Sequence, residues 1–164
     1  MSPGRGATDL LLESLAEHLM ARGTRVVGVV QTNTELSGSP LCDMDVRVLP
    51  DGPEYRISQS LGPEARGCRL DPVALEASVG EVESRLSATT ELLLVNKFGK
   101  HEAEGGGFRP TIGRALAMGV PVLVGLNEKN RDAWLAFSDG ASLELAPSLD
   151  ALTAWAETVA GGSD

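Results

Sequence analysis

Two polar residues, Asn96 and Lys97, follow directly on an apolar run, and their side chains are suited to holding an anion. The run, Leu92 to Val95, is followed by a polar, glycine-rich loop that reaches Phe108. Such a run is typical of a strand covered on both faces in a parallel sheet, where ligands bind at the carboxyl ends of the strands. We therefore expect Asn96, Lys97 and Lys100 to line a binding site. The alternative is a polar strand end without a ligand.

A glycine turn near the amino terminus is a second candidate anion site. Gly4 and Gly6 precede apolar residues at helical spacing, which run from Leu10 to Met20. The start of such a helix presents free backbone N–H groups and the positive end of the helix dipole. The residues that would contact an anion here are Gly4, Arg5, Gly6, Ala7, Thr8 and Asp9. The alternative is that Thr8 or Asp9 only caps the helix.

Other charged residues offer weaker candidates. Arg66 and Arg69 lie in a loop rich in glycine and proline, where guanidinium groups can close over an anion or simply face solvent. Asp43, Asp45 and Glu102 are the weak candidates for metal ligands, because no further ligand converges on them in the sequence. No Ser-His-Asp or Cys-His nucleophile is indicated.

Helices and apolar strands alternate along the chain, which is typical of an α/β protein. The strands Arg25–Gln31, Leu92–Asn96 and Val120–Leu126 are predicted to share one mainly parallel sheet within a three-layer sandwich. The segments Leu41–Leu49 and Tyr55–Ser60 alternate apolar and polar residues on either side of a Pro-Asp-Gly-Pro turn. They predict an antiparallel hairpin at the sheet edge.

The elements that follow are predicted from end signals and periodicity. Asp71 and Pro72 indicate the start of a helix as N-cap and first-turn proline. The carboxyl-terminal part predicts a short helix over Asn130–Phe137, a short strand over Ser142–Leu145 and a helix over Leu149–Val159. Residues 1–160 are expected to form one domain and residues 161–164 a flexible tail.

Composition limits the classes of partner. The 164 residues carry a formal net charge of −9, which argues against nucleic acid and anionic membrane as main partners. The sequence has no apolar run near the ~20 residues that span a bilayer, and no secretory leader. The two cysteines are therefore expected to be reduced in the cytoplasm. Homo-oligomerisation stays open. No strand precedes the glycine turn, so we expect either a start upstream of Met1 or a sheet built without that strand.

Several segments together resemble a known family over nearly the whole chain. The chain is similar to an uncharacterised bacterial family, domain of unknown function 2478, whose members have a P-loop-like fold and are often encoded beside molybdenum transport genes. The segments that carry the resemblance are Pro3–Asp9, Cys42–Asp45, Ile57–Gly62, Gly67–Asp71 and Val95–Gly105.

More distantly, the layout resembles small P-loop nucleoside triphosphatases, with degenerate motifs. Ala7 stands where the lysine that reaches the β- and γ-phosphates is found, and Asn96 and Lys97 stand where an Asp and a Glu position magnesium and water. The resemblance implies a cytosolic binding or regulatory protein for an oxyanion or phosphate-bearing ligand such as molybdate or a molybdenum-cofactor precursor. The alternative is a divergent nucleotide hydrolase or transferase. The cofactor is left open among molybdate, another oxyanion and a nucleotide.

Overall fold

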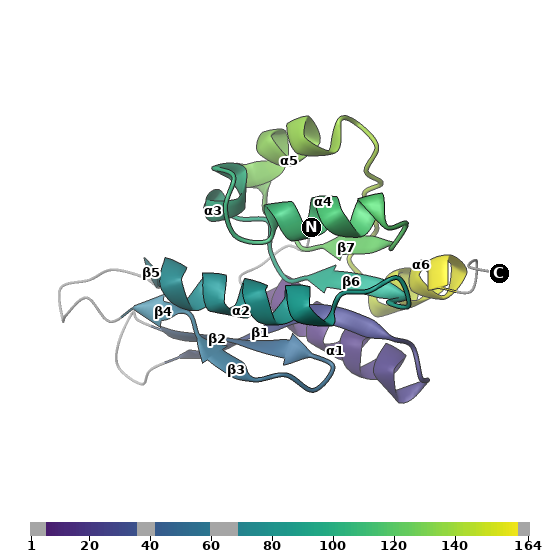
Figure 1. The fold of residues 1–164 in the computed structure, drawn as a ribbon, viewed down its shortest axis with the longest axis horizontal. Coiled ribbons are helices and arrows are strands. Elements are labelled where there is room, and N and C mark those ends of the chain that lie inside the picture. Colours follow the sequence, from purple (N-terminus) through teal and green to yellow (C-terminus); the bar gives the residue numbers. More distant parts are fainter. Residues whose placement is uncertain (1–5, 36–41, 60–68, 161–164) are drawn as a thin grey trace.

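The chain forms a mixed β-sheet flanked by helices, as the α/β pattern predicts. A computed structural model describes residues 6–35, 42–59 and 69–160 (Figure 1). The five-stranded sheet has the order β3-β2-β1-β6-β7, and a small separate sheet pairs β4 with β5. The strands are β1 (Val26–Glu35), β2 (Cys42–Leu49), β3 (Glu54–Arg56), β4 (Ser58–Gln59), β5 (Arg69–Leu70), β6 (Leu92–Val95) and β7 (Val122–Val124).

The parallel part of the sheet consists of β1, β6 and β7, which are the strands predicted to lie together. β6 pairs in parallel with β1 on one side and with β7 on the other. The predicted antiparallel hairpin is confirmed for β2 and β3, which extend the sheet beyond β1. Its second arm is shorter than the predicted Tyr55–Ser60, because β3 ends at Arg56 and Ser58–Gln59 pair with β5 in the small sheet. β1 continues to Glu35, past the predicted end at Gln31, because antiparallel pairing with β2 runs from Gly28 to Glu35.

Gly28 is required where β1 passes β6. Its φ of +142° is unfavourable for other residues, and a Cβ atom there would lie 1.8 Å from the carbonyl oxygen of Leu94. The close approach of the two backbones therefore depends on the absence of a side chain.

Helices cover both faces of the sheet. Along β6, Leu92 and Leu94 pack in one apolar cluster, while Leu93 and Val95 pack in another on the opposite face. The first cluster includes side chains of α1 (Ala7–Ala21) and α6 (Leu149–Ala160), and the second those of α2 (Pro72–Arg85), α4 (Arg109–Ala117) and α5 (Arg131–Ser138). None of the helices in the described ranges is long and apolar enough to cross a lipid bilayer.

Local signals placed some boundaries correctly. The Asp71 carboxylate accepts hydrogen bonds from the N–H groups of Val73 (3.0 Å) and Ala74 (3.4 Å), so Asp71 caps α2 as predicted.

β7 is shorter than the predicted Val120–Leu126, because the Val120 N–H bonds the carbonyl of Ala115 at the end of α4.

Two elements differ from the sequence expectation. The predicted strand over Ser142–Leu145 is wrong: the segment forms no ladder with another strand. Conversely, the loop after β6 contains the short helix α3 (Lys100–Ala103), which the glycine-rich composition did not indicate.

Candidate functional site

The carboxyl ends of β1 and β6 meet the amino end of α1 in a polar cluster centred on Asn96. This side chain is 3% exposed, and its Nδ2 donates to Asp9 Oδ1 (2.8 Å) and Gln31 Oε1 (3.2 Å). Its Oδ1 accepts from the backbone N–H of Gln31 at 3.2 Å. Both amide N–H groups of Asn96 are therefore used within the protein.

The cluster closes into a ring through a residue further along β1. Asn33 Nδ2 donates to the second oxygen of Asp9 at 2.5 Å, and its Oδ1 accepts from Gln31 Nε2 at 2.8 Å. Asp9 thus has a hydrogen-bond donor on each oxygen. Sequence reasoning did not identify Gln31 or Asn33 as site residues. One signal in the sequence could have identified them. Gln31 and Asn33 are two residues apart, which puts both side chains on one face of β1, near the carboxyl end of that strand.

The amino end of α1 leaves backbone donors free. Gly6 is the N-cap residue, with a left-handed φ of 77°, and no side chain caps the helix. The expectation that Thr8 or Asp9 is the cap is therefore wrong, because both lie in the first turn. Within the described residues, the N–H groups of Ala7, Thr8 and Asp9 have no protein acceptor.

Thr8 packs against the loop that follows β7. A Cβ atom placed on Gly125 would lie 3.1 Å from Thr8 Cγ2 and 2.0 Å from the carbonyl oxygen of Asn96. Gly125 therefore lets the start of α1 approach the end of β6. The structure therefore places Thr8, Asp9 and Asn96, three of the predicted site residues, close together, and their role in binding stays a prediction.

The predicted lysines lie at the rim rather than in the ring. Lys97 is exposed, its Cε lies 3.6 Å from the position of a Cβ atom at Gly99, and it has no ion pair or hydrogen bond with the described part of the chain. The Lys100 ammonium lies 3.9 Å from Glu104 and is strongly exposed. The anion-binding role of both lysines stays a prediction.

Three candidates cannot be placed, and a fourth is described only in part. Gly4, Arg5 and Arg66 lie outside the described residues. The backbone of Arg69 belongs to β5, and nothing is described of its side chain.

The weak metal candidates on β2 have a cationic partner. Arg56 on β3 lies 3.0 Å from Asp45 and 3.4 Å from Asp43, and the hydrogen bond to Asp45, followed by the charges of both carboxylates, raises the pKa of Arg56. Among the described residues, no group of three or more His, Cys, Asp and Glu side chains is arranged to hold a metal ion.

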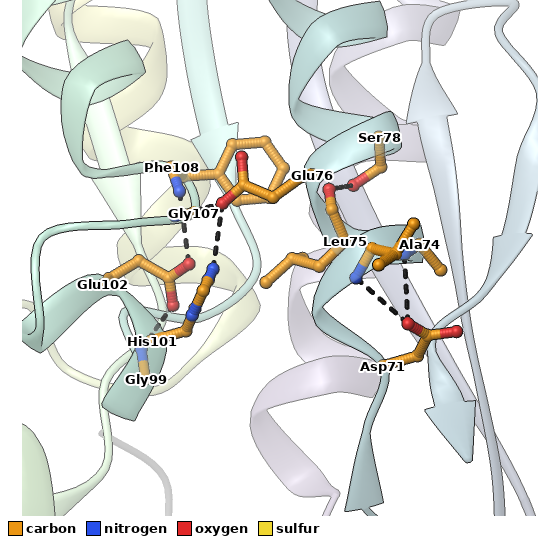
Figure 2. Close-up of polar contacts among 11 residues, drawn as sticks. Asp71, Ala74, Leu75, Glu76, Ser78, Gly99, His101, Glu102, Gly107 and Phe108 are labelled. Atoms are coloured by element: carbon orange, nitrogen blue, oxygen red, sulfur yellow. Dashed lines mark hydrogen bonds and ion pairs between the residues drawn. The ribbon is translucent and has the colours of Figure 1, made fainter.

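Glu102, the remaining metal candidate, supports the loop between β6 and α4. The carboxylate is 4% exposed and accepts from the N–H groups of Gly99 (2.9 Å) and Phe108 (3.2 Å), as Figure 2 shows. Gly107 has a φ of +56°, and a Cβ atom there would lie 1.6 Å from Glu102 Oε2. Gly107 therefore packs directly on this carboxylate, and a side chain at this position would displace it.

A second carboxylate ties the same loop to α2. Glu76 Oε1 lies 2.9 Å from His101 Nε2 and accepts from the Gly107 N–H at 2.8 Å (Figure 2). The loop that carries Lys97 and Lys100 is thus held at its far end by α2.

Comparison with known proteins gives a family and one curated relative. Residues 1–155 match the family described as "Protein of unknown function (DUF2478)". The molybdenum import ATP-binding protein ModC 2 of Bradyrhizobium diazoefficiens is 35% identical over 147 residues, which make up 90% of this chain and 16% of that protein. The chain therefore spans about a sixth of the length of this relative. No solved structure matches the chain.

Proposed function

Because this chain belongs to the DUF2478 family of unknown function, as its sequence motifs suggested, we propose that it is a cytoplasmic binding or regulatory domain for an oxyanion or a phosphate-bearing ligand. The ligand would bind where the carboxyl ends of β1 and β6 meet the start of α1. The fold would be a degenerate relative of the P-loop proteins, in which the glycine turn and α1 keep an anion site.

The observation that carries this proposal is the uncapped amino end of α1. The N–H groups of Ala7, Thr8 and Asp9 point out of the helix without a protein acceptor in the described residues, and the helix dipole adds positive potential there. Lys97 follows the buried Asn96 directly and offers an ammonium group without a described partner. An anion would satisfy these donors, and the Thr8 hydroxyl could contribute a further one.

Binding is favoured over phosphoryl transfer because the polar ring is already saturated. Both oxygens of Asp9 accept protein hydrogen bonds. The Asn96 amide is neutral and so offsets none of the charge of a magnesium ion, and its oxygen and nitrogen are already hydrogen-bonded to Gln31 and Asp9. Phosphoryl transfer depends mainly on positioning magnesium and the attacking group. Among the described residues of the ring, Asp9 is the one carboxylate, and both of its oxygens are already engaged.

The molybdenum connection comes from the relative, whose name assigns it to molybdenum import and ATP binding. We therefore place molybdate or a molybdenum-cofactor precursor first among ligands. The same name favours a second candidate, a nucleotide hydrolase or transferase. Turnover that depends on Mg²⁺ would distinguish that second candidate from a binding protein.

Calorimetric titration of the full chain with molybdate, tungstate, sulfate and ATP tests the site. One charge-assisted hydrogen bond contributes about 1.5–3 kcal/mol, so Lys97→Ala should weaken binding of the preferred ligand by roughly tenfold to a hundredfold. Arg114→Ala, which removes an exposed cation from the last turn of α4, is the matched control and should leave affinity unchanged. Equal affinities for wild type and Lys97→Ala, or no binding of any of these anions, would contradict the proposal.

A further inference from the structure

A hollow of about 570 Å³ lies beside β7, the edge strand of the sheet that is farthest from β3. Side chains of α1 and α6 line it from one face of the sheet, and side chains of α4 and α5 line it from the other. Both tryptophans of the chain contribute, Trp134 from one apolar cluster and Trp155 from the other. Its volume falls within the range of about 300–1,000 Å³ that is usual for small-molecule sites.

One wall of the hollow is a strand edge with unused backbone groups. In the parallel pairing of β6 with β7, Leu93 donates to the carbonyl of Pro121 and Gly125 donates to the carbonyl of Val95. This register turns the N–H and C=O groups of Val122 and Val124 away from β6. Within the described residues, these groups have no hydrogen-bond partner. Each of the two valines therefore offers a donor beside an acceptor.

The charges around the hollow favour an anion at the start of α1. Arg131 and Glu144 are the charged side chains in the lining, and they pair with one another at 3.4 Å, so their charges largely cancel. Thr8 and Gly125 also line the hollow, and a Cβ atom placed on Gly125 would lie 3.1 Å from Thr8 Cγ2. The first turn of α1, whose N–H groups have no described acceptor, thus borders the apolar space.

We propose that the ligand of this site is an organic anion, with a flat heteroaromatic ring in the hollow and a phosphate or similar oxyanion at the start of α1. This inference rests on the proposed function and narrows its ligand to one that carries an aromatic ring. The indole of Trp134 and that of Trp155 offer apolar contact from the two helical layers. A lactam, which has a donor beside an acceptor on its edge, matches the free backbone groups of Val122 and Val124. A free inorganic oxyanion would leave both the apolar walls and this strand edge unused.

Calorimetric titration of the full chain with matched probes tests this inference. Guanosine monophosphate and flavin mononucleotide both carry a lactam and a phosphate, and they represent two sources of this chemistry. Ribose phosphate lacks the aromatic ring, guanosine and riboflavin lack the phosphate, and naphthyl phosphate has a flat ring without hydrogen-bonding groups. At least one lactam phosphate should bind about tenfold or more tightly than ribose phosphate, because the apolar walls remove its ring from water. The same ring without phosphate should bind about tenfold or more weakly than its phosphate.

Two further measurements locate the ring. The preferred lactam phosphate should slow amide hydrogen exchange at Val122 and Val124, and naphthyl phosphate should protect these amides less. Ala141→Phe adds a side chain at an exposed position in the lining of the hollow. It should weaken the lactam phosphate by about tenfold or more and leave ribose phosphate unchanged. Ala136→Phe makes the same change at an exposed position of α5 outside the lining, and should leave both affinities unchanged.

The outcomes distinguish this inference from the proposed function. If ribose phosphate or molybdate binds, but neither lactam phosphate binds more tightly than ribose phosphate, the anion site stands and the ring site is wrong. If no anion binds, the proposed function fails and this inference fails with it. Equal affinities for a ring with and without its phosphate would overturn the inference. So would equal effects of Ala141→Phe and Ala136→Phe, or equal protection of the two amides by naphthyl phosphate.

Discussion

Replacing Asn96 with aspartate should show how strongly the polar ring depends on a neutral amide. Asn96→Asp removes the donor that lies 2.8 Å from Asp9 and puts a second carboxylate in its place. At that separation, two full charges repel by about 6 kcal/mol with an effective dielectric constant of ~20. The pair can escape by binding one proton. For an ordinary carboxyl group at pH 7 this costs about 4 kcal/mol, which sets the upper limit of the penalty.

The expected loss at pH 7 is therefore about 3–4 kcal/mol, or a fall in melting temperature of roughly 10 °C. The proton bound by the folded variant sets the sign of the pH dependence of its stability loss. The folded variant binds a proton that its unfolded chain lacks near neutral pH, so the stability gap from wild type is full at pH 7. As the pH falls toward ~4, the gap should shrink by about 1.4 kcal/mol per unit.

Urea denaturation of wild type and variants, followed by circular dichroism between pH 7 and pH 4.5, measures this gap. Asn33→Asp is the matched control, because it makes the same chemical change against the other oxygen of Asp9 at an exposed position. Its cost should be about 1 kcal/mol or less, as for exposed ion pairs. Equal losses in the two variants, or a gap for Asn96→Asp that does not change with pH, would refute the buried bridge between Asn96 and Asp9.

Three further outcomes are expected. Glu102→Ala leaves the buried N–H groups of Gly99 and Phe108 without acceptors, so the free energy of unfolding should fall by about 2–4 kcal/mol, whereas Glu102→Gln keeps one acceptor and should cost about half as much. Gly107→Ala should destabilise by more than about 2 kcal/mol, because of its positive φ and the clash with Glu102; Gly113→Ala, in an open position on α4, should gain about 0.5–1 kcal/mol in the same urea titration. Purified protein should hydrolyse ATP far below about 1 per second in a coupled assay with Mg²⁺, and a rate in that ordinary range would favour the hydrolase candidate.

The sequence predicted the elements whose signals are local. Continuous apolarity in Leu92–Val95 sufficed to place β6 in the buried centre of the sheet, and Asp71 with Pro72 located the start of α2. These features depend on residues adjacent in the chain, so periodicity and capping preferences capture them.

The remaining features depend on partners distant in the sequence. Ser142–Leu145 has the alternation of a strand but lacks a neighbour to pair with, and alternation alone cannot reveal this. Glu102 looked like a solvated loop carboxylate, yet the chain folds back on it through Gly107 and buries it. Gln31 joined the site because β2 extends β1 beyond the apolar run. Asp9 and Asn96 could be expected near one another, because in a parallel sheet the helix starts lie at the carboxyl ends of the strands. Asp9 is in the first turn of α1, and Asn96 directly follows β6.

The two edges of the five-stranded sheet differ in a way that limits self-association. At one edge, β3 is short and exposes the charged residues Glu54 and Arg56. Arg56 forms ion pairs with Asp43 and Asp45, so this edge carries further charged side chains. Such an edge disfavours pairing with another sheet. At the other edge, the backbone groups of Val122 and Val124 on β7 have no hydrogen-bond partner among the described residues. A molecule with one sheet edge open to strand pairing can pair with a second copy across a two-fold axis. It then has no open edge left to pair with a third copy. Edge-to-edge pairing through this sheet would therefore end in a closed dimer and would not propagate into a fibre.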